Sequence, residues 1–198
     1  NEKEESLDLT SYVEFCFWNA VDDSTNFQRN LSLGEVEVCG SELYHKTEYR
    51  ERRNHFAYYT VNAPIDGFDT SRDDFLGVYG SIEHPKSVYE GVSHNSVASG
   101  GAVIGSHHLK VTLAPGESKS FIFLLGYSEN PSDDKWEAPN VIKKDPAKKI
   151  MEKFAASKQV DAAFAQLNAY WDELLSRYHV ESQDPQENSM ANIWNQNQ

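Results

Sequence analysis

The sequence has few cysteines and no long apolar run, and these absences exclude several classes of protein. Two cysteines, Cys16 and Cys39, are too few for a disulfide framework. Because each lies in an apolar stretch, we expect both to be reduced thiols in the core of a cytoplasmic protein. No run approaches the roughly 18–20 apolar residues of a membrane span, and residues 1–5 lack the features of a signal peptide.

Basic residues are also scarce. The chain has 18 Lys and Arg against 31 Asp and Glu, which gives a net charge of −13. Binding to a nucleic-acid backbone requires clustered Lys and Arg, so we expect no nucleic-acid partner. Phosphate-binding glycine loops, nucleophile elbows, CxxC and HExxH motifs are absent as well. The His107-His108 pair lacks the spacing of a metal site, and we expect structural or surface roles for it.

What is present is a β-rich pattern with 12% aromatic residues. Apolar alternation predicts strands at Ser11–Trp18, Glu35–Val38 and Phe56–Val61. Residues 109–113 alternate into an Ala-Pro-Gly-Glu turn signal and residues 121–125 return as an apolar run, so we predict a hairpin there. Strands at this spacing favour an antiparallel β-sandwich over residues 1–130. The Gly-rich and Asp-rich stretch from Asp66 to Gly105 predicts a long loop excursion, of the kind that is usually functional or packed against another domain.

The pattern changes to a helical period after Pro131, and we expect an α-helical linker over residues 131–186. Its apolar stripe predicts burial against a partner surface, which is either the sandwich or another domain; the stripe consists of Val160, Phe164, Leu167, Trp171, Leu174 and Tyr178. Residues 187–198 begin a further helix-like segment without completing an apolar face. We interpret them as the start of a domain that the chain does not contain.

Two polar segments invite a chemical interpretation and also have a simpler one. Asp22-Asp23 could supply paired carboxylates for acid–base chemistry, but adjacent residues seldom aim at one reacting centre, so a capped turn is favoured. The segment His45–His55 could bind phosphate through its arginines. Because glutamates alternate with those arginines, an ion-pair network at an interface is favoured.

The connection from residue 18 to residue 30 is the best candidate for ligand contact. It carries the amides and guanidinium of Asn19, Asn26 and Arg29 beside the rings of Trp18 and Phe27. Planar donors and acceptors next to an apolar ring suit the recognition of sugar hydroxyls. Because Asn-rich connections are common, this chemistry alone favours a well-capped turn over ligand contact.

Three runs of the sequence resemble a known family: EFCFWNAVDDSTNFQRNLSLGEVEV, YHKTEYRERRNHFAYY and IGSHHLKVTLAPGE. They are similar to the N-terminal domain of cellobiose phosphorylases, which belong to glycoside hydrolase family 94. The resemblance covers essentially the whole chain. It implies a mainly β fold, a super-β-sandwich of galactose-mutarotase-like type, followed by the helical linker and by an (α/α)-barrel catalytic domain that this chain lacks.

The resemblance also implies a reaction and a set of partners. The reaction is inverting phosphorolysis of a β-glucoside disaccharide such as cellobiose, which gives α-glucose 1-phosphate and a free sugar such as glucose. Phosphate is a co-substrate, and no metal or organic cofactor is implied. In the family, residues that match Asn19, Asn26 and Arg29 line the acceptor subsite, and Trp18 and Phe27 are candidates for sugar stacking. The intact enzyme would be a cytoplasmic homodimer.

The resemblance places the general-acid Asp and the phosphate site outside these 198 residues. We therefore expect no catalytic residue in this chain and no activity from the chain alone. Two other hypotheses stay open: a non-catalytic carbohydrate-binding module, and a purely structural β-sandwich that packs against a barrel or a second subunit.

Overall fold

The computed structural model describes residues 2–16, 35–46 and 54–194. The chain divides into two compact units, Asn1–Lys153 and Phe154–Gln198. The first unit contains the β-sheets and the second unit is helical.

The first sheet of the first unit is built on the long strand β7 (Val103–Leu113), to which three shorter strands pair antiparallel. β1 (Glu5–Thr10) and β2 (Val13–Glu14) pair with successive stretches of β7, and β6 (Gly67–Ser71) pairs with it as well. The alternation of Ser11–Trp18 therefore corresponds to a strand of two residues within the described part of that segment. β1 had no sequence signal strong enough to predict it.

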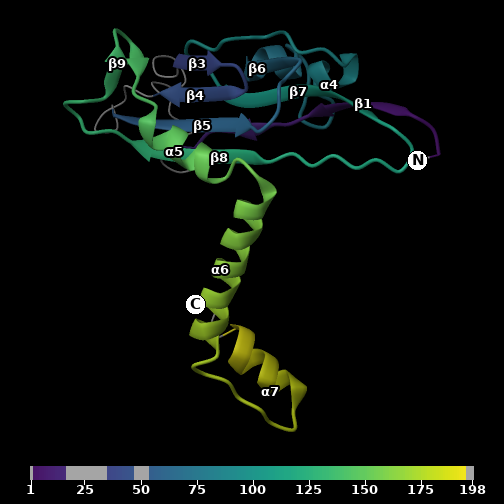
Figure 1. Ribbon diagram of the computed structural model, residues 1–198, viewed down its shortest axis with the longest axis vertical. Coiled ribbons are helices and arrows are strands. Elements are labelled where there is room, and N and C mark those ends of the chain that lie inside the picture. Colours follow the sequence, from purple (N-terminus) through teal and green to yellow (C-terminus); the bar gives the residue numbers. More distant parts are fainter. Residues whose placement is uncertain (1, 17–34, 47–53, 195–198) are drawn as a thin grey trace. The chain divides into compact units, whose positions relative to one another are not determined.

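The second sheet has four antiparallel strands in the order β3-β4-β5-β8. They are β3 (Glu35–Cys39), β4 (Glu42–Lys46), β5 (His55–Val61) and β8 (Phe123–Glu129). Figure 1 shows these strands lying side by side. The strands predicted at residues 35–38 and 56–61 are confirmed.

The two sheets pack face to face, which confirms the predicted antiparallel sandwich. The ring of Tyr59 on β5 stacks on His107 of β7 at 4.7 Å between ring centroids. Val61 lies in one cluster with Leu109 and Val111 of β7. Burial of these apolar surfaces is the main term that holds the sheets together.

A third layer covers the other face of the second sheet. It consists of the hairpin of β9 (Trp136–Ala138) and β10 (Val141–Ile142) and of helix α5 (Asp145–Lys153). Ile142 and Ala147 form a cluster with side chains of β4 and β5, namely Tyr44, Phe56 and Tyr58. β5 is thus buried on both faces, whereas the alternation predicted for residues 56–61 would have left one face exposed.

The outer face of the first sheet is covered by two short helices, α3 (Arg72–Leu76) and α4 (Lys86–Glu90). Phe75 and Leu76 of α3 pack on Ile104 of β7, and the ring of Tyr12 stacks on Phe75. The stretch from residue 66 to residue 105 is therefore an ordered layer with a strand and two helices, where the sequence predicted a loop.

The predicted hairpin at residues 109–125 is wrong in its pairing. Both strands and the turn exist, and Glu117 N–H donates to the Ala114 carbonyl at 3.0 Å. However, β7 pairs in the first sheet, whereas β8 pairs with β5 in the second. The turn therefore joins the two sheets of the sandwich, and a pattern of alternation carries no information about which strand is the partner.

The second unit contains α6 (Ser157–Leu175), α7 (Pro185–Ser189) and a turn of π-helix, η2 (Met190–Trp194). α6 confirms the predicted helical period. Several side chains of the predicted stripe are exposed within this chain, with exposed fractions of 61% for Phe164 and 47% for Trp171, and their burial against another domain stays a prediction. In the described part of the chain, no helix is both long and apolar enough to cross a membrane.

The bounds of the predicted segments can be compared with these elements. The third layer falls within residues 131–153, so this part of the expected linker belongs to the first compact unit. The division into residues 1–130, 131–186 and 187–198 stays a prediction. The cysteine prediction is wrong in one respect, because Cys16 and Cys39 are both exposed thiols rather than core residues.

Candidate functional site

The residues predicted to contact a sugar lie outside the described residues. This holds for Asn19, Asn26 and Arg29 and for the rings of Trp18 and Phe27. It also holds for Asp22-Asp23 and for residues 47–53 of the charged segment. The structure does describe the framework at both ends of the connection between β2 and β3.

Both flanks of this connection pair with one short stretch of chain, residues 98–105. Before the connection, Glu14 of β2 lies opposite Ile104 of β7. After it, Glu35 of β3 forms a bridge with Ser99, and Val36 N–H donates to the Ala98 carbonyl at 3.3 Å. The position of residues 98–105 therefore sets where the connection begins and where it ends.

The first flank is fastened by an ion pair. Arg72 Nε donates to Glu14 Oε1 at 3.0 Å, and the Tyr12 hydroxyl donates to the same oxygen at 2.5 Å. The hydrogen bond from Tyr12 is the main cause that holds the pKa of Glu14 below its usual value. Burial, together with the neighbouring Glu14, raises the pKa of Tyr12 to about 12. Arg72 N–H also donates to the Ala102 carbonyl at 3.1 Å, which ties this flank to the stretch before β7.

The second flank is held in place by Thr70, a fully buried residue of β6. Its hydroxyl donates to the Ser96 carbonyl at 2.9 Å and accepts from Ala98 N–H at 2.8 Å. The backbone N–H of Thr70 also donates to the Ser96 carbonyl at 3.0 Å. Thr70 thus fixes the backbone of Ala98, and the carbonyl of Ala98 accepts the hydrogen bond from Val36 N–H.

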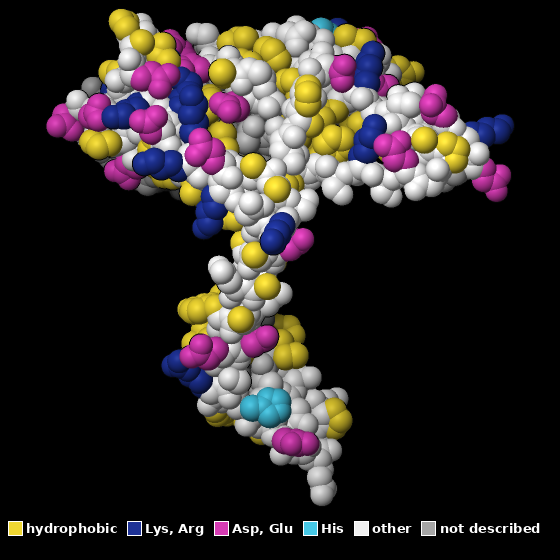
Figure 2. Space-filling model, in the orientation of Figure 1, with side chains coloured by type: hydrophobic (Ala, Val, Ile, Leu, Met, Phe, Trp, Pro, Cys, Tyr) yellow, Lys and Arg dark blue, Asp and Glu magenta, His cyan; other side chains and the backbone are white. Residues whose placement is uncertain are grey.

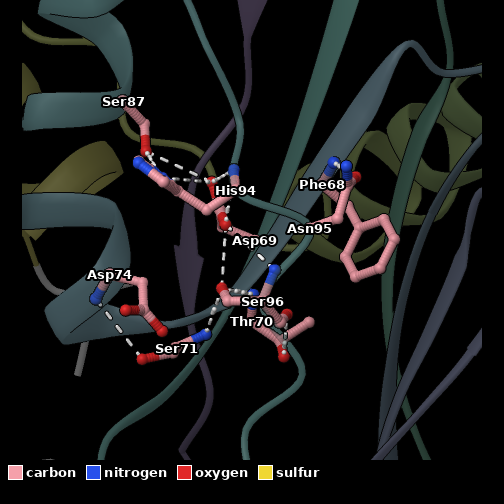
Figure 3. Close-up of polar contacts among 9 residues, drawn as sticks. All are labelled: Phe68, Asp69, Thr70, Ser71, Asp74, Ser87, His94, Asn95 and Ser96. Carbon is pink, nitrogen blue, oxygen red and sulfur yellow. Dashed lines mark hydrogen bonds and ion pairs between the residues drawn. The ribbon is translucent and has the colours of Figure 1, made fainter.

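Asp69, the preceding residue of β6, is the centre of a buried hydrogen-bond network (Figure 3). Oδ1 accepts from Ser96 N–H at 3.2 Å and from the Ser96 hydroxyl at 2.8 Å. Both carboxylate oxygens accept from His94 N–H, at 3.1 and 3.2 Å, and Oδ2 accepts from the Ser87 hydroxyl at 3.2 Å. The network fastens residues 94–96 and α4 to β6. Burial of a carboxylate is tolerated only with such a complete set of donors.

Ser87, His94 and Asp69 are the residue types of a hydrolytic triad, but their geometry is different. In a triad, the serine and the carboxylate contact opposite nitrogens of the imidazole. Here His94 Nδ1 faces both the Ser87 hydroxyl at 3.2 Å and Asp69 Oδ2 at 3.9 Å. Ser87 is buried and donates to Asp69. The cluster therefore holds the α4 layer in place and does not generate a nucleophile.

No pattern in the sequence predicted this cluster. Asp69 stood in an Asp-rich stretch that looked like a polar loop. The available signal was its place two residues after Gly67, in a short segment where apolar and small residues alternate with polar ones. Gly67 is required there, because a Cβ would lie 2.8 Å from Cβ of Ser93, which directly precedes the segment that the network fastens.

A second charged cluster joins the third layer to the sandwich and includes Lys46 of the predicted ion-pair segment. Glu37 of β3 accepts from the nearly buried ammonium groups of Lys46 and Lys144, at 3.0 and 2.7 Å, and from Ile142 N–H at 2.8 Å. Burial acts to raise the pKa of Glu37, but the hydrogen bonds from Lys144, Ile142 and Lys46 outweigh it and hold the pKa below its usual value. Lys46 also pairs with Glu35 at 3.2 Å.

The paired histidines of β7 have structural roles, as the sequence predicted. His107 Nε2 donates to the Ser41 carbonyl at 3.0 Å, and its ring is fully buried. Burial lowers the pKa of His107 to about 4. His108 Nε2 contacts Asp8 Oδ1 at 2.7 Å. Within residues 2–16, 35–46 and 54–194, no group of three or more His, Cys, Asp or Glu side chains could hold a metal ion.

On the face of the first unit shown in Figure 2, acidic and basic side chains are interspersed rather than gathered into a basic patch. This agrees with the net charge of −13.

The fold and the sequence together place the chain in a class of carbohydrate-enzyme domains. The sequence of residues 1–157 matches the family model "Glycosyl hydrolase 94, supersandwich domain". The chain belongs to this family.

Three curated relatives extend the comparison. The chain is 31% identical over 193 residues to the N,N'-diacetylchitobiose phosphorylase of Vibrio proteolyticus, which covers 96% of this chain and 22% of the relative. It is 29% identical to the enzyme of the same name from Vibrio furnissii, with the same coverage. It is 26% identical to the solabiose phosphorylase of Paenibacillus borealis, covering 97% of this chain and 23% of the relative. The chain thus spans less than a quarter of the length of these relatives.

Proposed function

We propose that this chain is the supersandwich module of an inverting disaccharide phosphorylase. The observation that carries the proposal is the family match over residues 1–157 together with phosphorylase relatives that align with nearly the whole chain. In the reaction, phosphate attacks the anomeric carbon of a β-linked disaccharide while an acid protonates the leaving sugar oxygen, and an α-sugar 1-phosphate and a free sugar result. Phosphate is a co-substrate, and no metal or organic cofactor takes part. The acid and the phosphate-binding residues belong to other domains of the whole protein.

The module's own contribution is to the acceptor subsite, where the free sugar leaves or enters. Asn19, Asn26 and Arg29 hydrogen-bond its hydroxyls, and Trp18 or Phe27 provides an apolar wall. The side-chain chemistry supports this role, because amide and guanidinium groups satisfy several hydroxyls at once. The described framework supports it as well, because both flanks of the connection pair with residues 98–105, which lead into β7 and include its start.

The acceptor sugar is the open part of this proposal. The resemblance to cellobiose phosphorylases leaves three kinds of acceptor open: glucose, a cellodextrin and N-acetylglucosamine. Two relatives are named for N,N'-diacetylchitobiose and one for solabiose. An assay of acceptor use therefore compares glucose with N-acetylglucosamine. The intact enzyme acts as a cytoplasmic homodimer in this proposal.

The first test is an NMR titration of the 198-residue chain with glucose, N-acetylglucosamine and cellobiose. We expect saturable shift changes for the side-chain amides of Asn19 and Asn26. Shift changes confined to other residues would favour a carbohydrate-binding module with a different site. No saturable change with any of the three sugars would leave the purely structural role.

The second test uses a full-length homologue that carries this domain. Replacing Asn26 with Ala removes one hydrogen-bond partner, which weakens transition-state binding by roughly 1–3 kcal/mol. We expect kcat/KM for the acceptor sugar in the synthetic direction to fall by the factor that corresponds to this free energy, while the KM for the sugar 1-phosphate hardly changes. Asn30→Ala in the same connection is the matched control, since Asn30 is not in the predicted set. Equal effects of the two substitutions on acceptor use would contradict the proposed role.

A further inference from the structure

Helix α6 carries an apolar stripe that is largely open to solvent. The centre of the stripe consists of Phe164, Leu167, Trp171 and Leu174, which are between 40% and 61% exposed. No side chain of α6 is buried. A helix of this length is marginal in water by itself, and an amphipathic helix is normally stabilised by the packing of its apolar face. The stripe therefore requires a partner surface.

The spacing of the stripe is that of a seam between two helices. The four residues follow one another at steps of three, four and three, so the two rings lie seven residues apart and the two leucines do as well. Two apolar positions that repeat every seven residues form the seam of paired helices, in which each side chain inserts between side chains of the facing helix. In α6, rings occupy one position of the repeat and leucines the other.

This division into rings and leucines favours one direction of pairing with an identical helix. In a parallel pair each position meets its own copy, so layers of two rings would alternate with layers of two leucines. In an antiparallel pair, Phe164 lies opposite Leu174 of the second copy. Leu167 then lies opposite Trp171, and every layer holds one ring and one leucine. Facing large and small side chains fill a seam evenly, and antiparallel helix dipoles attract each other.

The exposed area of the stripe suits a weak dimer. Completely covered aromatic side chains bury about 150–250 Å² each, so six partly exposed side chains supply roughly 600 Å² per copy and about 1,200 Å² per pair. The six are Phe164, Leu167, Tyr170, Trp171, Leu174 and Leu175. This area is at the lower end of the range for specific interfaces. Asp172 and Glu173 lie on α6 away from the seam, so the pairing buries neither charge.

We infer that the α6 stripe is a contact surface for a second copy of this chain, which packs antiparallel with a ring opposite a leucine in each layer. The inference goes beyond the proposed function, which expects a homodimer of the intact enzyme but assigns no surface to it. It does not depend on the sugar chemistry.

The first experiment is sedimentation equilibrium of the 198-residue chain at increasing concentration. A reducing agent is present, because Cys16 and Cys39 are exposed thiols. We expect the mass to rise from 22.5 kDa towards twice that value, with a Kd on the order of 10 µM. Leu167→Lys and Trp171→Glu each place a charge in the seam and should raise the Kd at least about tenfold.

A matched control tests whether the effect belongs to the stripe. Ala165→Lys adds the same charge at an exposed position of α6 outside the stripe, and we expect the wild-type Kd for it. All these substitutions are made at positions of α6 that are not buried, so the near-ultraviolet circular dichroism of the sandwich should stay unchanged.

The direction of pairing is tested with two equimolar mixtures. In the mixture of Leu167→Lys with Trp171→Glu, an antiparallel pair brings the introduced lysine opposite the introduced glutamate, and its other layer keeps Leu167 opposite Trp171. In the mixture of Leu167→Lys with Leu167→Glu, only a parallel pair brings the two charges together. We therefore expect the first mixture to associate several-fold more tightly than the second.

Each result supports or refutes the inference. A mass of 22.5 kDa at every concentration would refute it and leave another domain of the whole protein as the partner of the stripe. Association that neither Leu167→Lys nor Trp171→Glu weakens would place the contact elsewhere on the chain. A reversed order of the two mixtures would refute the antiparallel arrangement. The sugar titration tests the proposed function separately, so the failure of one leaves the other standing.

Discussion

The buried imidazole of His107 makes the stability of the sandwich depend on pH. Its ring lies between the sheets, stacked on Tyr59, and Nε2 donates to the Ser41 carbonyl. Because a carbonyl can only accept, Nε2 carries the proton of the neutral ring. Nδ1 is then unprotonated and accepts from the Ser11 hydroxyl at 3.3 Å. Both contacts suit the neutral ring, and protonation would place a positive charge in an apolar layer.

The sign and size of the effect follow from the pKa values. Burial lowers the pKa of His107 from 6.5 to about 4, so between these values the unfolded chain binds more protons than the folded one. The stabilisation is therefore complete above pH 6.5 and is lost as the pH falls towards 4. One pKa unit corresponds to about 1.4 kcal/mol, which gives a loss of about 2 kcal/mol at pH 5 and about 3 kcal/mol at pH 4.

The assay is urea unfolding at pH 8, 6 and 5, followed by the near-ultraviolet circular dichroism of the tyrosine-rich sandwich. His107→Gln lacks the titrating ring, so we expect its loss of stability from pH 8 to pH 5 to be smaller than that of wild type by about 2 kcal/mol. His84→Gln, at an exposed position, is the control and should follow wild type. If the pH dependence of His107→Gln equalled that of wild type, the burial argument would be refuted, whatever the variant's absolute stability.

Two further predictions concern packing and charge in the first unit. A Cβ on Gly126 would lie 2.0 Å from Cζ of Tyr58, which is its cross-strand partner. In urea unfolding, Gly126→Ala should therefore lower the free energy of unfolding by about 3 kcal/mol, and by much less in a Tyr58→Leu background. Equal losses in the two backgrounds would contradict the steric reason. Glu37→Gln leaves Lys46 and Lys144 buried without their shared carboxylate and should cost about 3 kcal/mol, whereas Glu117→Gln removes only a surface pair with Lys119 and should cost below about 1 kcal/mol. A loss at Glu37 as small as that at Glu117 would mean that the cluster adds no net stability.

The strands could be predicted from the sequence where one physical rule dominates. Alternation predicts the strand at residues 56–61, although both faces of that strand are buried, and the alternation of residues 35–38 reflects one buried face. The pairing could not be predicted in the same way. β7 and β8 are successive strands along the chain, joined by residues 114–122, yet they belong to different sheets. Only the packing of side chains on both faces of β5 decides this arrangement.

The candidate site divides along a similar line. The types of side chain on the connection suggested sugar contact, because chemistry can be read from residue types alone. The residues that fix the flanks could not be found this way, because Asp69, Thr70 and Arg72 are common polar residues in a stretch that looked like a loop. Their role depends on burial and on contacts with residues 14 and 94–98, which lie far from them in the sequence.

The burial of Asp69 and Thr70 is itself an argument for a geometric role. Apolar residues in the same places would avoid the cost of removing a carboxylate and a hydroxyl from water, and such replacements often leave stability unchanged or raise it. What apolar residues cannot do is choose one register for residues 94–98 against β6, whereas each directed hydrogen bond fits a single register. The carbonyl of Ala98, one of those residues, accepts a hydrogen bond from Val36 N–H. The register of residues 94–98 against β6 therefore also determines the position of the start of β3. On this reasoning the polar interior of the α4 layer contributes mainly to the placement of the connection's flank rather than to the stability of the sandwich.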